Sequence, residues 1–285
     1  MNIDMNFHDY DYSESVLVER INTILKRQKE NDDRKKSLET VFQCIDYTTL
    51  EGSDNQDKIN AFCAKAMSFG NNALHLSLPA VCIYSPFVRQ AKILLKDSGI
   101  KVATVACAFP SGQMPLDLKI KEVEYCVEEG ADEVDMVISR GTFLAGNYDD
   151  VYNEICAVRE VCKCPVHLKV ILETGELKTV ANIRKASELA IMAGADFIKT
   201  STGKIADAAT PLAAIVMIDT VKEYYDNTGI MIGFKPAGGM KTVDDALTYY
   251  YLVRDILGDK WLNSKYFRIG TSRLADKVQE EMMTL

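Results

Sequence analysis

The chain has 285 residues, of which 47% are hydrophobic and 26% charged, and its formal net charge is -8. This is the composition of a globular protein with enough apolar material for a large core. The acidic balance argues against nucleic acid or an anionic membrane as the main partner, although a few local lysines can still bind one phosphate.

The cysteines and the N-terminus bear on where the protein works. Eight cysteines are scattered along the chain, several inside apolar runs such as "AVCIYS", where cysteine usually acts as a small core residue. The "CKC" at 162–164 lacks zinc-site spacing, so we expect reduced thiols and no bound metal. With no signal-peptide pattern and no apolar run of about 18 residues, the sequence predicts a cytoplasmic protein that does not enter the membrane.

The first 39 residues differ from the rest of the chain. Leu17, Ile21, Ile24 and Leu25 form a helical apolar stripe, and the charged stretch "KRQKENDDRKK" follows it. We expect residues 1–39 to form an N-terminal helical extension that packs outside the main body. A partner-binding arm is the alternative.

From residue 40 onward, short apolar runs alternate with longer amphipathic ones. Eight runs resemble strands, and most of them are rich in Val and Ile and lack strict alternation, which is typical of strands covered on both faces. They are "VFQCID" from 41, "AVCIYS" from 80, "VATVACAF" from 102, "EVDMVIS" from 133, "HLKVILET" from 167, "DFIKTS" from 196, "MIGFKPAG" from 231 and "YFRIGTS" from 266.

Helical patterns lie between these runs. "PLDLKIKEVEYCVEEGA" places Leu116, Ile120, Val123 and Val127 on one expected face. "TVANIRKASELAIMAG" and "TVDDALTYYYLVRDILG" both begin with Thr and end with Gly, which suits the start and stop of a helix. Eight strands alternating with helices predict a (β/α)8 TIM barrel over residues 40–285. An open doubly wound sheet is the alternative, weakened because no GxGxxG follows the first strand.

Charged residues interrupt five of the expected strands. They are Asp46, Asp135, Lys169, Lys199 and Lys235. In such a barrel reactive groups gather at the C-terminal strand ends, so we expect these side chains to share one cavity if they point inward. Burial and a neighbouring ammonium both lower the pKa of a lysine, and a neutral lysine attacks carbonyl groups to form a Schiff base. Any one of them could instead be an exposed or paired charge.

Glycine-rich loops follow the last two expected strands. Gly238 and Gly239 come after the seventh, and Gly270 and Ser272 after the eighth. These loops form the usual phosphate site of such barrels, because glycine lets backbone N–H groups approach an anion. Lys204 could reach the same anion. Plain strand-to-helix turns are the alternative. The residues alone therefore predict a Schiff-base enzyme acting on a phosphorylated carbonyl compound.

Several of these blocks together resemble a known family. "ADEVDMV", "LKVILETGEL", "ADFIKTSTGK", "GFKPAGGMKT" and "FRIGTS" are similar to blocks of the deoxyribose-phosphate aldolase family, as are "CIDYTTLEG" and "AVCIYSPFV". The resemblance covers roughly residues 40 to 275. It implies a class I aldolase with a (β/α)8 barrel, no cofactor and a homodimeric state. The implied reaction is reversible cleavage of 2-deoxy-D-ribose 5-phosphate to D-glyceraldehyde 3-phosphate and acetaldehyde, in deoxyribonucleotide catabolism.

The resemblance also implies roles for single residues. Lys199 would form the Schiff base, Lys235 would lower its pKa and assist a proton relay, and Asp135 would donate and accept protons. The implied substrate-binding residues are Asp46, Lys169, Thr202, Lys204, Gly238, Gly239, Gly270 and Ser272.

This chain departs from the family pattern at its C-terminal end. Arg273 stands where many members have a second serine, and the chain ends "EEMMTL" rather than with a tyrosine. Two other hypotheses remain. A different Schiff-base barrel, such as a transaldolase or a dehydratase, would keep the lysine and the phosphate loops. A catalytically inactive barrel used for binding would be expected to have lost part of the reactive set, which is complete here.

Overall fold

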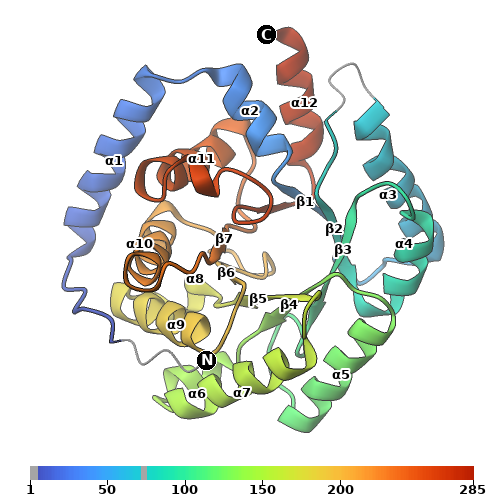
Figure 1. Ribbon diagram of the computed structural model, residues 1–285, viewed down its shortest axis with the longest axis horizontal. Coiled ribbons are helices and arrows are strands. Elements are labelled where there is room, and N and C mark those ends of the chain that lie inside the picture. The colour runs from blue at the N-terminus through green and yellow to red at the C-terminus, as the bar shows by residue number, and fades with distance from the viewer. Residues whose placement is uncertain (1–5, 72–75) are drawn as a thin grey trace.

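The computed structural model describes residues 6–71 and 76–285, which form a barrel of eight parallel strands surrounded by helices (Figure 1). The strands lie side by side in the order β7-β6-β5-β4-β3-β2-β1-β8. They are β1 Ile45–Thr48, β2 Ala80–Tyr84, β3 Lys101–Ala106, β4 Glu133–Val137, β5 His167–Ile171, β6 Phe197–Lys199, β7 Gly233–Lys235 and β8 Ile269–Thr271.

The barrel closes between β7 and the segment around β8. Single parallel bridges join Phe234 to Phe267 and Ala237 to Gly270. Backbone N–H groups complete this seam: Arg268 N donates to the carbonyl of Phe234 and Gly270 N donates to that of Pro236. The predicted TIM barrel is confirmed, and the open doubly wound sheet is excluded.

Helices cover the outside of the barrel and follow most strands (Figure 1). They are α1 Glu14–Glu30, α2 Arg34–Phe42, α3 Gln56–Ser68, α4 Val88–Leu94, α5 Leu116–Glu128, α6 Arg140–Leu144, α7 Tyr148–Val161, α8 Thr174–Leu177, α9 Val180–Met192, α10 Pro211–Thr228, α11 Val243–Ile256 and α12 Leu274–Thr284. Short 3-10 turns occupy Phe69–Asn71, Ser85–Phe87 and Asp259–Trp261. In the part of the chain that the structure describes, no helix has both the length and the hydrophobicity needed to span a membrane.

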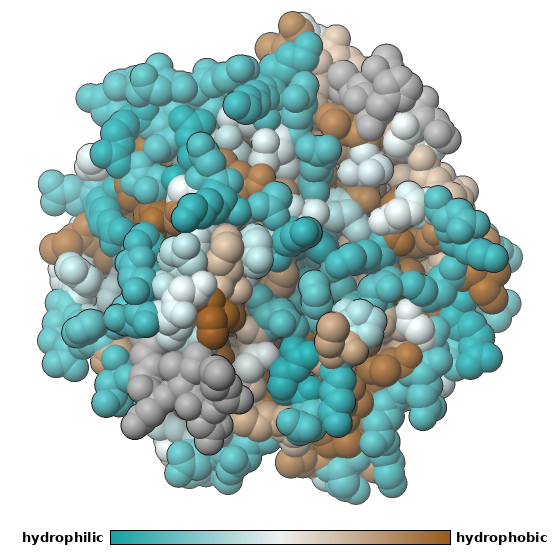
Figure 2. All heavy atoms as spheres, in the orientation of Figure 1, coloured by the Kyte–Doolittle hydropathy of each residue, from teal (hydrophilic) through white to brown (hydrophobic). Residues whose placement is uncertain are grey.

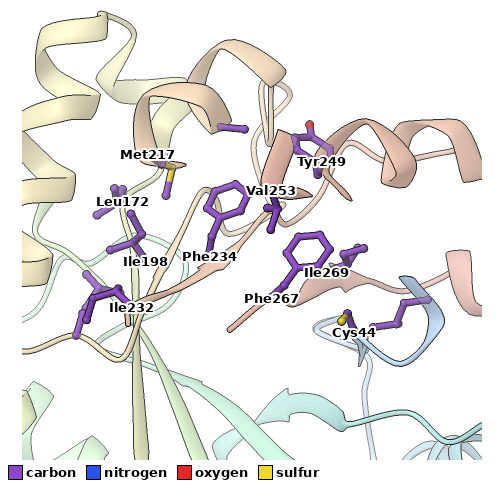
Figure 3. Close-up of a cluster of buried hydrophobic side chains, with 14 of the residues drawn as sticks. Cys44, Leu172, Ile198, Met217, Ile232, Phe234, Tyr249, Val253, Phe267 and Ile269 are labelled. Atoms are coloured by element: carbon purple, nitrogen blue, oxygen red, sulfur yellow. The ribbon is translucent and has the colours of Figure 1, made fainter. Parts of the chain in front are cut away.

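Side-chain alternation along the strands separates two environments. Ile198, Phe234 and Ile269 point out of the barrel, toward Met217 of α10 and Val253 of α11 (Figure 3). Their neighbours in sequence point inward, and in β6 and β7 these inward neighbours include lysines. The apolar layer between strands and helices therefore holds the barrel together and leaves its interior free for polar groups.

The sequence prediction failed at two local points. The run expected as a strand from Val41 begins as the end of α2, and β1 starts only at Ile45. In α5 the buried residues are Lys119, Val123 and Cys126, whereas Leu116 is 43% exposed. Val123 of the expected face is buried, and Ile120 and Val127 are partly buried against the core. The prediction fails at Leu116, because the first turn instead buries Lys119 beside Glu154 of α7, a tertiary contact that hydrophobic periodicity does not detect.

The N-terminal helix α1 lies against α10 and α11 (Figure 1). Its predicted stripe is buried at Leu17, Ile21 and Ile24, and Arg20 pairs with both carboxylate oxygens of Asp219 on α10 at 2.6 and 2.8 Å. The outer surface over α1 and α2 is mainly hydrophilic (Figure 2). The predicted division of the chain at residue 39 falls inside α2, and the independence of the extension stays a prediction.

Candidate active site

The five charged strand residues meet inside the barrel. In the strand ladders Asp135 lies opposite Lys169, and Lys199 lies opposite Lys235, so these four residues enter the barrel from β4, β5, β6 and β7 at neighbouring heights. Asp46 enters from β1 on the far side. All five side chains are buried, and Lys199, at 3% exposed, is the one that reaches the surface of a cavity.

Asp135 is the centre of this cluster. Its Oδ2 atom accepts hydrogen bonds from Nζ of Lys199 and from Nζ of Lys235, each at 2.7 Å. Its Oδ1 atom accepts one from Nζ of Lys169, also at 2.7 Å. Lys235 also forms an ion pair with Asp46. One carboxylate therefore joins three lysines, and a proton leaving Lys199 has Asp135 as an acceptor within hydrogen-bond distance.

Two further buried residues complete the network and were missed in the sequence. Glu133 pairs with Lys169 at 2.6 Å and with Arg268 at 2.7 Å, and Arg268 also pairs with Asp46. Glu133 lies two residues before Asp135, and Arg268 lies two residues before Gly270. Because side chains alternate along a strand, this spacing places both residues on the inner face and could have revealed them.

The charge balance of the network singles out one lysine. Three buried carboxylates, Asp46, Glu133 and Asp135, face four buried cations, which are Lys169, Lys199, Lys235 and Arg268. A buried cluster is least costly when its charges cancel, so one cation should lose its proton. Arginine stays protonated, which leaves the lysines.

The pKa shifts agree on which lysine it is. Burial and the ammonium of Lys235 lower the pKa of Lys199 despite the opposing effect of Asp135. Burial also acts to lower the pKa of Lys235, but the carboxylates of Asp135 and Asp46 outweigh it and leave that pKa above its ordinary value. The pKa of Asp135 is held well below its ordinary value by the lysines around it, although burial acts in the opposite direction. Lys199 is thus the group most readily neutral, beside an ionised Asp135.

A cavity of about 110 Å³ opens above Lys199. Its lining comes from the loops after β1, β6, β7 and β8 and comprises Thr48, Leu50, Glu51, Lys199, Thr202, Gly203, Lys204, Ala237, Gly238, Gly270, Thr271 and Ser272. Six predicted residues are among them: Lys199, Thr202, Lys204, Gly238, Gly270 and Ser272. Asp46, Asp135, Lys169 and Lys235 lie buried in the barrel interior.

The glycine at 238 is required by the way the loops meet. Its φ of +73° is in the left-handed region, and a Cβ there would lie 2.8 Å from Cα of Gly203. Gly203 belongs to the loop after β6, so two backbones approach closely at the cavity wall. Gly239 lies next to Ala208 and Ala209 and is not among the lining residues.

Charged and polar groups at the cavity mouth suit an anion. Lys204 Nζ lies 3.2 Å from a carboxylate oxygen of Glu51, a partner that the sequence did not suggest. Ser272 lies just before α12, and within the described residues no side chain caps that helix at Arg273. Its first N–H groups and the positive end of its dipole are available to a ligand. Arg273 is exposed and stays off the cavity lining.

No group of three or more His, Cys, Asp or Glu side chains in the described ranges is placed to hold a metal ion. The site places the amine of Lys199 beside a proton acceptor, Asp135. The cavity mouth above them contains the cation Lys204 and lies near the first N–H groups of α12. In a parallel eight-stranded barrel, reactive groups gather at the C-terminal strand ends, and an amine beside a carboxylate at that position is an arrangement that carbonyl chemistry can use.

Comparison with known proteins identifies the class more closely. A sequence model described as DeoC/LacD family aldolase matches residues 40–253. The chain therefore belongs to the DeoC/LacD family of aldolases, and it is a lyase.

Individual relatives extend over most of the chain. A deoxyribose-phosphate aldolase from Agrobacterium fabrum is 44% identical over 246 residues, covering 86% of this chain and 91% of that protein. The human deoxyribose-phosphate aldolase is 42% identical over 249 residues, covering 84% of this chain and 78% of the human protein. The solved deoxyribose phosphate aldolase from Aeropyrum pernix, described as tetrameric, is 23% identical with a TM-score of 0.69, covering 93% of this chain and 97% of that chain. At that identity the likeness shows the fold.

Proposed function

We propose that this protein cleaves 2-deoxy-D-ribose 5-phosphate reversibly to D-glyceraldehyde 3-phosphate and acetaldehyde through a Schiff base on Lys199. The observation that carries the proposal is the position of Lys199: it is the group of the buried ionic network that faces the cavity, and its pKa is lowered by burial and by Lys235. The relatives named deoxyribose-phosphate aldolase supply the choice of substrate.

The first half of the reaction makes the electron sink. The neutral amine of Lys199 attacks the C1 aldehyde of the open-chain sugar, and loss of water leaves a protonated imine. Asp135, whose Oδ2 accepts a hydrogen bond from Nζ of Lys199 at 2.7 Å, then accepts the proton of the C3 hydroxyl through a water molecule. The C2–C3 bond breaks, its electron pair moves into the imine to give an enamine, and C3 becomes the aldehyde of glyceraldehyde 3-phosphate.

The second half restores the amine. The enamine takes a proton at C2, and addition of water to the resulting imine releases acetaldehyde and Lys199. Lys235 shares Oδ2 of Asp135 with Lys199, and its raised pKa keeps it protonated, so it can resupply protons through Asp135. Asp46 pairs with Lys235 and Lys169 pairs with Asp135, so these two residues fix the groups of the proton relay in position.

The phosphate end of the substrate would lie at the cavity mouth. Lys204 supplies the charge there, and Thr202, Gly238, Gly270 and Ser272 form the surrounding wall. Gly239, which does not line the cavity, would help to set the conformation of the loop after β7. The cavity is smaller than the roughly 300–1,000 Å³ of pockets for drug-sized ligands, which suits a short sugar phosphate that enters with its aldehyde toward Lys199.

A coupled assay tests the proposal. Purified protein with 2-deoxyribose 5-phosphate should release glyceraldehyde 3-phosphate and acetaldehyde in equal amounts, and Lys199→Ala should abolish both. A panel containing transaldolase and dehydratase substrates separates the aldolase from other Schiff-base barrels. Turnover of one of those substrates, with 2-deoxyribose 5-phosphate left intact, would overturn the proposal.

The homodimer, the cytoplasmic location and the place in deoxyribonucleotide catabolism remain predictions from the sequence, as does the absence of a cofactor. Light scattering on the purified protein would measure the number of subunits, and cell fractionation would locate it.

A further inference from the structure

A chain of contacts ties the β6 loop to the two loops before it. Glu173, just after β5, accepts a hydrogen bond from the backbone N–H of Thr202 at 3.1 Å and another from the Thr202 hydroxyl. The guanidinium of Arg140, at the start of α6, lies 3.2 Å from the same carboxylate. The Thr202 hydroxyl in turn accepts a hydrogen bond from the backbone N–H of Lys204 at 3.1 Å.

Glu173 occupies an unfavourable position for a glutamate. Its side chain is 0% exposed, and its backbone is left-handed, with φ 57° and ψ 60°. Left-handed backbone is disfavoured for a residue with a Cβ, and a buried carboxylate needs compensating partners. Strained backbone of this kind is commonly retained near functional sites. Burial raises the pKa of Glu173, while its bonds to Thr202 and the charge of Arg140 act in the opposite direction.

Glu173 does not itself line the cavity, but its partner Thr202 belongs to a loop that does. Thr202, Gly203 and Lys204 are three consecutive lining residues. With Thr202 fixed at its N–H and its hydroxyl, and Lys204 N–H fixed to that hydroxyl, the loop has little freedom to turn. Arg140 extends the tether, since it also donates to the carbonyl of Pro110 at 2.7 Å and pairs with Glu176 at 2.6 Å.

We propose that Glu173 is a positioning residue that holds the Thr202–Lys204 loop in the shape that binds the phosphate of the substrate, with Arg140 as its counter-ion. This inference rests on the proposed function for the identity of the anion. It assigns to Glu173 an effect on anion affinity, exerted through Thr202, and none on the chemistry at Lys199. The two effects separate in kinetics as KM against kcat.

The test uses Glu173→Gln, which keeps the volume and removes the charge. Asp196→Asn is the matched control, because Asp196 also accepts one backbone N–H, from Leu168 at 2.7 Å, and one guanidinium, from Arg159 at 2.6 Å. Asp196 precedes β6 and lies at the opposite end of the barrel. Urea unfolding of both variants measures their losses of stability.

Two readouts are independent of each other. Calorimetry with inorganic phosphate measures anion binding without turnover, and Lys204→Ala shows whether the phosphate binds at this mouth. Steady-state kinetics compare 2-deoxyribose 5-phosphate with unphosphorylated 2-deoxyribose. For Glu173→Gln we expect phosphate Kd and the KM of the phosphorylated sugar to rise about tenfold, as loss of a hydrogen bond to a charged group allows. In Glu173→Gln the kcat for both sugars and the KM for free 2-deoxyribose should change less than about twofold. Asp196→Asn should change neither the phosphate Kd nor the KM of the phosphorylated sugar.

A second pair of variants covers the case in which Glu173→Gln does not fold. Thr202→Val removes the hydroxyl at nearly constant volume and should reproduce the loss of phosphate binding. Thr202→Ser keeps the hydroxyl and should bind phosphate as the parent protein does. Folded Glu173→Gln or Thr202→Val with the Kd of the parent protein would overturn the proposal. So would failure of the parent protein to bind phosphate at a site weakened by Lys204→Ala. Absence of sugar cleavage with intact phosphate binding would instead overturn the proposed function.

Discussion

Replacing Lys235 by methionine should raise the pKa of Lys199 and move the pH dependence of the reaction. Nζ of Lys199 and Nζ of Lys235 each lie 2.7 Å from the same oxygen of Asp135, so they are no farther apart than twice that distance. At an effective dielectric constant of about 20, two unit charges at this separation repel by about 3 kcal/mol. This corresponds to about two pKa units.

The sign of the effect follows from the charge balance. In the parent protein four cations face three carboxylates, and Lys199 can relieve the excess by losing its proton. In Lys235→Met three cations face three carboxylates, and a protonated Lys199 completes the balance. The fraction of Lys199 present as the nucleophilic amine at neutral pH then decreases, and kcat/KM at pH 7 should fall by up to about a hundredfold for a rise of about two pKa units.

The assay is the pH profile of kcat/KM for cleavage of 2-deoxyribose 5-phosphate. We expect its acid limb to move to higher pH by about two units in Lys235→Met. A lost proton relay would lower the plateau, but it would leave the position of the limb unchanged. Lys119→Met, which removes a buried lysine paired with Glu154 outside the cavity, controls for general damage. An unshifted acid limb in folded Lys235→Met would refute the argument.

Three further outcomes are expected. Gly238→Ala should lower the free energy of unfolding in urea by roughly 1–3 kcal/mol and raise KM, because its Cβ would lie 2.8 Å from Cα of Gly203; unchanged values would contradict the close approach. Glu51→Gln removes the carboxylate 3.2 Å from Lys204 and should lower the KM for the phosphorylated sugar about twofold, in line with a weak exposed ion pair; added salt should shrink this gain, and a higher KM would argue that Glu51 binds substrate. Burial acts to raise the pKa values of the carboxylates Asp46 and Asp135, but the surrounding cations outweigh it and leave both pKa values lowered. The stability that these groups contribute is therefore present above their unfolded pKa near 4 and lost as pH falls below it. Urea titrations at pH 6 and pH 3 should show this loss, and equal unfolding free energies would contradict it.

Much of the barrel could be predicted from local pattern. Strands buried on both faces are continuous apolar runs, and residues typical of turns and helix ends separate one run from the next. The start of β1 could not, since Val41 and Phe42 are equally apolar at the end of α2. The buried face of α5 depends on Lys119 meeting Glu154, 35 residues away. Such pairings belong to tertiary structure and leave little trace in hydrophobic periodicity.

The candidate site shows the same division. Inward-facing lysines in apolar strands were visible as exceptions to the strand pattern, and the structure brings Lys169, Lys199 and Lys235 onto one carboxylate. Arg268 was overlooked because a charged residue near the start of a strand usually marks an exposed end. The partner of Lys204 lies 153 residues away at Glu51, and no local pattern connects the two.

Borohydride trapping tests the central claim most directly. The protein is incubated with 2-deoxyribose 5-phosphate, reduced, digested and mapped by mass spectrometry, with Lys199→Ala as the control. The account predicts one adduct on the peptide that contains Lys199 and none in the variant. A folded protein that yields no adduct, or an adduct on Lys169 or Lys235 instead, would contradict the assignment of Lys199 as the Schiff-base lysine.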